Sequence, residues 1–97
     1  MLETWFHPEA QAEYQGALVW YQVRSAQAAT RFEAEIEHVL GLIASNPEMF
    51  SKYDDTHRFV MLRRFPYSLV YQVLPTYIYM VAVAQSRRSP GYWKRRG

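Results

Sequence analysis

Cysteine is absent from this chain of 97 residues. Its absence excludes a disulfide framework, a thiol nucleophile and a cysteine zinc site, and it fits a reducing cytosol. Long apolar runs are also missing, because the longest, YIYMVAVA at 77–84, is far shorter than the roughly 20 residues of a membrane helix. The N-terminal stretch has no basic start and no long apolar run, so we expect no signal peptide and no membrane partner.

Acidic residues are missing from residues 56–97, which hold eight bases and a charge of +8. Residues 1–55 hold all nine acids and three bases, a charge of −6. This split predicts either an anionic partner for the C-terminal half or mutual neutralisation of the two halves across the fold. The histidines (His7, His38 and His57) are too scattered for metal-ligand spacing, so we expect no metal, and nothing in the sequence indicates another cofactor.

What is present indicates one folded domain, residues 1–97, since 49% of the residues are hydrophobic and 21% are charged. LETWF at 2–6 predicts a first strand. An apolar stripe at helical spacing predicts a helix over about 8–23, with Pro8 in its first turn. Ser25 can cap a second helix that ends near Ser45, before Pro47. Because only two or three residues separate the helices, we expect an antiparallel helical hairpin.

Three β-type runs follow a loop at 46–57, and they cover 58–65, 68–74 and 77–85. Short connections containing Pro66 and Pro75 predict an antiparallel meander. The last run is apolar on both faces, which suits a central strand. The predicted fold class is therefore α+β, in the order β-α-α-β-β-β. The helical hairpin packs on one face of an antiparallel sheet and leaves the other face as a basic surface.

Four stretches, in this order, resemble the RelE/ParE toxin superfamily. HPEAQAEYQGALVWYQ is similar to its opening helix and AATRFEAEIEHVLGLIASNP to its second helix. RFVMLRRFPYSLVYQV resembles its paired strands, and IYMVAVAQSRRSPGYWKRR resembles its last strand and tail. The resemblance covers nearly the whole chain. It implies a small cytoplasmic toxin of a type II toxin–antitoxin system, of the kind linked to plasmid stabilisation and growth inhibition.

Two activities divide the superfamily. RelE-like members cut mRNA in the ribosomal A site, whereas ParE-like members poison DNA gyrase. RelE-like enzymes have an arginine where this chain has Ser68, and many relatives have a histidine where it has Gln85. Serine cannot hold a phosphate as a guanidinium does, and glutamine transfers no proton near pH 7. These departures favour a ParE-like toxin that binds gyrase and is no enzyme. A RelE-like mRNA endonuclease and an inactive binding module of the same fold are the alternatives.

The resemblance also implies partners and site residues. We expect a cognate antitoxin, a heterotetramer or larger complex with it, and gyrase as the target (ribosome and mRNA in the alternative). If the protein is an RNase, Arg88 and Tyr92 are the catalytic candidates. The candidates for target or antitoxin binding are Arg58, Arg64, Arg87, Arg88, Tyr92, Trp93, Lys94 and Arg95. Arg58 and Arg64 share one face of a regular strand, and Arg63 lies on the other.

Overall fold

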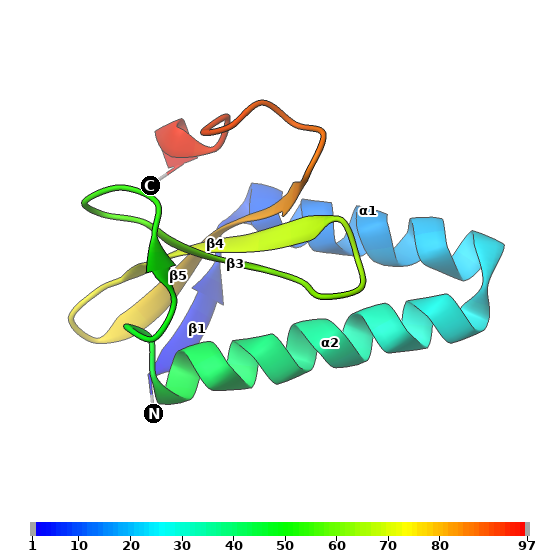
Figure 1. Ribbon diagram of the computed structural model, residues 1–97, viewed down its shortest axis with the longest axis horizontal. Coiled ribbons are helices and arrows are strands. Elements are labelled where there is room, and N and C mark those ends of the chain that lie inside the picture. The colour runs from blue at the N-terminus through cyan, green and yellow to red at the C-terminus, as the bar shows by residue number, and fades with distance from the viewer. Residues whose placement is uncertain (1, 97) are drawn as a thin grey trace.

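The computed structural model describes residues 2–96, which form two helices and five strands in one layered unit (Figure 1). The elements in chain order are β1 (Glu3–Phe6), α1 (Pro8–Arg24), α2 (Ala26–Ser45), β2 (Ser51–Lys52), β3 (Arg58–Met61), β4 (Tyr67–Val73), β5 (Tyr77–Gln85) and the 3₁₀ turn η1 (Lys94–Arg96). The predicted α+β class is confirmed. Within residues 2–96, no helix is both long and apolar enough to span a membrane.

The helix boundaries follow from local hydrogen bonds. His7 caps α1, since its Nδ1 accepts the Glu9 amide at 3.0 Å, and Pro8 occupies the first helical position. Ser25 ends α1 and also caps α2, because its Oγ accepts the Ala28 amide at 3.2 Å. A single residue thus joins the helices where two or three were predicted. The short connection holds α1 and α2 as the expected hairpin.

The sheet has the order β1-β5-β4-β3-β2. Strands β3 to β5 form the predicted antiparallel meander. Strand β2, which lies within the stretch 46–57 predicted as loop, adds an antiparallel pair with β3, whereas β1 joins β5 in parallel, so the whole sheet is mixed. Strand β5 is central between β1 and β4, which explains why it is apolar on both faces. A register shift opposite Val70/Tyr71 leaves one extra residue, Val81, on β5, so Val81 and Ala82 both turn to the face away from the helices.

The main core lies between the helical hairpin and the sheet. Its α2 stripe is the predicted one, with Phe32, Ile36 and Ile43 fully buried. A second, smaller cluster lies on the opposite face of the sheet, where Trp93 is 3% exposed and packs on Val70, Val81 and Ala82. The C-terminal segment (residues 86–96, orange to red) therefore covers part of the face that we expected to be free (Figure 1).

The first meander strand is shorter than predicted, because β3 ends at Met61. Arg63 and Arg64 lie in the β3–β4 connection, so the alternation of a regular strand does not apply to them. This connection is attached to α2, where the carboxylate of Glu35 accepts the Arg63 amide. It is anchored by Phe65, whose ring lies 5.1 Å from Tyr21 and 5.2 Å from Phe32, between centroids.

Candidate functional site: the C-terminal segment on the sheet

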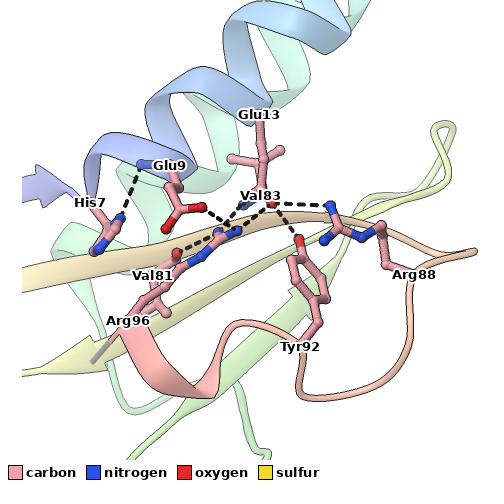
Figure 2. Close-up of polar contacts among 8 residues, drawn as sticks. All are labelled: His7, Glu9, Glu13, Val81, Val83, Arg88, Tyr92 and Arg96. Carbon is pink, nitrogen blue, oxygen red and sulfur yellow. Dashed lines mark hydrogen bonds and ion pairs between the residues drawn. The ribbon is translucent and has the colours of Figure 1, made fainter.

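Glu13, in the second turn of α1, is the acceptor that attaches the C-terminal segment to the fold (Figure 2). Its Oε1 accepts hydrogen bonds from the Val83 amide at 3.0 Å and from Arg96 Nη1 at 2.9 Å. Its Oε2 accepts from the Tyr92 hydroxyl at 2.6 Å and from Arg96 Nη2 at 3.0 Å. One carboxylate thus joins helix α1, strand β5 and the C-terminal segment.

The pair of Glu13 and Arg96 is largely withdrawn from water, with side chains 16% and 10% exposed. Burial alone would lower the pKa of Arg96, but the hydrogen bonds and charge of Glu13 outweigh it and raise that pKa above its ordinary value. Burial, together with the Glu13 hydrogen bond and charge, raises the pKa of the Tyr92 phenol well above 10. Tyr92 is therefore a neutral donor over the physiological range, and it is no proton acceptor.

Arg88 reaches the same carboxylate from the solvent side. Its Nη1 lies 3.9 Å from Glu13 Oε2, its side chain is 52% exposed, and its guanidinium lies 3.8 Å from the centre of the Tyr92 ring. The chain returns towards Arg96 through Gly91, whose φ of 76° is in the left-handed region that glycine tolerates. The Pro90-Gly91 turn brings Arg88 and Arg96, one from each basic cluster, to the same carboxylate. An acid from α1 neutralises part of their charge.

A cavity of about 210 Å³ separates the C-terminal segment from the sheet. Aromatic and apolar side chains line most of it, and Met61, at its rim, is 67% exposed. Ser68 and Gln85 lie in its wall together with Arg88 and Tyr92. The lining residues include no histidine and no carboxylate, so the described cavity offers no side chain that takes up a proton near pH 7.

His57 packs its ring against the buried Trp93. The centroids of the two rings lie 4.6 Å apart, and His57 is 5% exposed. Its Nδ1 lies 3.0 Å from Asp54 Oδ1 and its Nε2 lies 3.3 Å from the Gln72 amide nitrogen. The backbone amide of Thr56 is the largest cause that lowers the pKa of Asp54, with further hydrogen bonds from His57, to about 2. These contacts stabilise the turn at residues 54–57, which packs against the C-terminal segment through His57 and Trp93.

The other predicted binding residues lie at several places. Arg58 donates to the carbonyl oxygens of Phe50 at 2.7 Å and Glu48 at 3.2 Å, so it holds the loop before β2. Lys94 lies over the Tyr53 ring, 5.5 Å from its centroid. The side chains of Arg64, Arg87 and Arg95 are exposed. The predicted residues therefore do not form one patch, and Trp93 faces inward.

Three residues at this site were not predicted to act there, namely Glu13, Arg96 and His57. Glu13 lies off the apolar stripe of α1 and reads as a solvent residue. Its partners are 70 to 83 positions away in the sequence. The one available signal was the charge split, which allowed the acidic half to neutralise the basic half. Among residues 2–96, no three histidine or carboxylate side chains converge as a metal-ligand group.

The comparisons with known proteins agree with this architecture. The family model described as "ParE toxin of type II toxin-antitoxin system, parDE" matches residues 5–90. No curated protein matches the chain. A solved structure from P. aeruginosa, the chromosomal ParDE TA system, has a similar fold, with a TM-score of 0.73 at 16% identity over 88% of this chain and 96% of that chain. The family match covers most of the sequence and confirms the predicted resemblance, and this chain therefore belongs to the ParE toxin family of type II toxin–antitoxin systems.

Proposed function

We propose that this protein inhibits growth by binding DNA gyrase and that a cognate antitoxin neutralises it. The observation that carries the choice of target is the composition of the cavity beneath the C-terminal segment. Ser68 and Gln85 stand in its wall, at the positions where RNA-cleaving relatives are expected to have an arginine and a histidine. The surface is thus suited to contact with a protein rather than to acid–base chemistry.

Cleavage of RNA through the ribose 2′-OH needs a base, an acid and cationic groups for the developing charge on phosphorus. The Tyr92 hydroxyl donates a hydrogen bond to Glu13, and its raised pKa keeps the phenol protonated, which disfavours a role as base. Arg88 retains a half-exposed guanidinium, but Glu13 and the Tyr92 ring both contact it. The Glu13 carboxylate already accepts hydrogen bonds from the Val83 amide, the Tyr92 hydroxyl and Arg96, so it is committed to the fold. Arg88 then supplies only one of the three required parts.

The proposal is tested with purified gyrase and supercoiled plasmid. We expect micromolar toxin to inhibit supercoiling or to trap cleaved DNA, and we expect expression in cells to cause filamentation and a DNA-damage response. A parallel translation reaction should show no cleavage of ribosome-bound mRNA. Gyrase that works normally at micromolar toxin would exclude this target.

An RNase activity is the second candidate, because Arg88 and Tyr92 lie side by side at the rim of the cavity. Under this alternative, mRNA on the ribosome is cut at codons, and Arg88→Ala together with Tyr92→Phe abolishes the cutting. Growth arrest that survives both substitutions would eliminate it. A chain that binds its antitoxin but arrests no growth would instead be the inactive binding module.

The proposed setting is the cytoplasm, with the toxin and antitoxin joined in a heterotetramer or larger complex. An acidic antitoxin segment is attracted to a half of the chain that carries +8. We expect association to slow as salt is raised, because exposed charges are screened over about 8 Å at physiological ionic strength. Stopped-flow association at several salt concentrations measures this, and an on-rate independent of salt contradicts steering by the basic surface.

A further inference from the structure

A second basic site lies between the β3–β4 connection and helix α2, away from the C-terminal segment. Its open cavity of about 600 Å³ is lined by Arg31, Ala34 and Glu35 of α2 and by Arg63 and Arg64 of the connection. Three of the five lining residues are arginines. They come from two segments about 30 positions apart, so folding brings them together.

These arginines are available to a ligand. All three are exposed. Among residues 2–96, the hydrogen bonds and ion pairs include none from their guanidinium groups, whereas Arg58, Arg88 and Arg96 all have acceptors. The one nearby carboxylate, Glu35, accepts the backbone amide of Arg63. Its bond positions the connection and leaves the arginine side chains to other acceptors.

The position of the cavity is defined by packing. Phe65 packs its ring against both Tyr21 of α1 and Phe32 of α2, and the Glu35 carboxylate accepts the amide of Arg63, two positions earlier. The connection therefore reaches over α2 (Figure 1). The backbone of a segment fixed at two points loses little further freedom on binding, so the entropic cost is confined mainly to the arginine side chains.

The chemistry favours separate carboxylates over a phosphate chain. Guanidinium forks bind both groups in bidentate geometry. Double-stranded DNA, however, carries one charge per roughly 1.7 Å along its axis. Glu35 lines the same cavity as the three arginines, so a continuous chain of phosphates laid across it would meet a carboxylate. A peptide can place two or three acidic side chains at the arginines and keep the rest of its length neutral.

An apolar site lies on the other flank of the same connection. A cavity of about 490 Å³ there is lined by Trp20 and Tyr21 of α1 and by Pro66 and Tyr67, and the polar side chains of Gln85 and Arg87 also line it. Trp20 is 51% exposed, and its neighbours Val19 and Val23 are 53% and 77% exposed. A peptide that crosses the connection would thus meet arginines on one side and an aromatic surface on the other.

We propose that Arg31, Arg63 and Arg64 form the anchor site for an acidic segment of the antitoxin, with carboxylates in the arginine cavity and an adjacent apolar side chain at Trp20. This inference rests on the proposed function, because it presupposes an antitoxin partner. It names a contact surface that is separate from the cavity beneath the C-terminal segment.

The test measures binding of the cognate antitoxin, and of a glutamate-rich peptide, to the wild type and to a triple variant, Arg31→Gln, Arg63→Gln and Arg64→Gln. Each charge-assisted pair that is lost should weaken binding about 10-fold, so the triple variant should lose about 100-fold if the ligand makes two such pairs and about 1,000-fold if it makes three. Lys52→Gln, on β2, removes one exposed charge elsewhere and should change binding by less than about 2-fold. A second triple variant, Arg31→Lys, Arg63→Lys and Arg64→Lys, keeps the charge. It should bind more tightly than the triple Gln variant but less tightly than the wild type, because an ammonium lacks the planar fork of a guanidinium.

Several outcomes would overturn the inference. One is a triple Gln variant that matches Lys52→Gln in its effect, and another is a triple Lys variant that restores binding fully, which would indicate long-range attraction alone. A 20-base-pair duplex that shifts the NMR signals of the three arginines, where a glutamate-rich peptide does not, would assign the site to phosphate. If the antitoxin fails to bind even the wild type, the proposed function fails, and the peptide titration still tests the cavity by itself.

Discussion

Glu13 is the residue whose removal should separate the C-terminal segment from the rest of the fold. Glu13→Ala removes the acceptor of the Val83 amide, the Tyr92 hydroxyl and both Arg96 contacts. Breaking a buried ion pair while the other charge stays in place costs about 3–5 kcal/mol. Because Arg96 is only 10% exposed, that cost applies as long as the segment remains docked.

The protein loses less free energy if residues 86–96 detach from the sheet. Undocking returns Arg96 and Tyr92 to water and sacrifices mainly the burial of Trp93, which contributes roughly 2–3 kcal/mol. Because exposing Trp93 costs less than keeping Arg96 buried without its carboxylate, the segment should detach. We therefore expect Glu13→Ala to lower the free energy of unfolding by about 2–3 kcal/mol, with the helices and sheet intact and residues 86–96 detached.

Two measurements check this prediction. Urea denaturation gives the stability loss, and hydrogen exchange resolved along the chain shows whether amides of 86–96 lose protection. Glu9→Gln is the matched control, since Glu9 is 66% exposed and lies 3.7 Å from Arg96, so its pair contributes less than about 1 kcal/mol. A Glu13→Ala protein with wild-type protection at 86–96 and a stability change below about 0.5 kcal/mol would refute the reasoning.

Three other substitutions or conditions test separate contacts. Asp54 has a folded pKa of about 2, below its ordinary 3.8. Its contribution to the free energy of unfolding is therefore complete above pH 3.8 and is lost as the pH falls towards 2. Asp54→Asn should flatten this part of an acid titration of stability. Gly91→Ala places a Cβ 3.0 Å from Lys94 Cε at positive φ, and it should destabilise the docked segment by about 1–2 kcal/mol, seen as faster exchange there; an unchanged rate would show that the turn tolerates a side chain. Phe65→Ala should cost about 2 kcal/mol by denaturation, less than the roughly 3–5 for a fully buried ring, and a neutral result would contradict its role in anchoring the connection.

The sequence determined the helices and most of the sheet by itself. Ser25 carries its capping role in its own side chain, and the spacing of Phe32, Ile36 and Ile43 defines the buried face of α2. Such features depend on hydrogen bonds and periodicity within a few residues, so they can be predicted from the sequence. The same holds for the Pro90-Gly91 turn and for the apolar character of β5 on both faces.

The tertiary structure alone decided the pairing of polar groups. Glu13 and Arg96 are 83 positions apart, and nothing near either residue distinguishes it from a solvated charge. The parallel placement of β1, the burial of His57 and the meeting of Arg31 with Arg63 are of the same kind. A charged side chain shows no periodic pattern that names its partner, so its role is settled only when packing brings distant segments to one place.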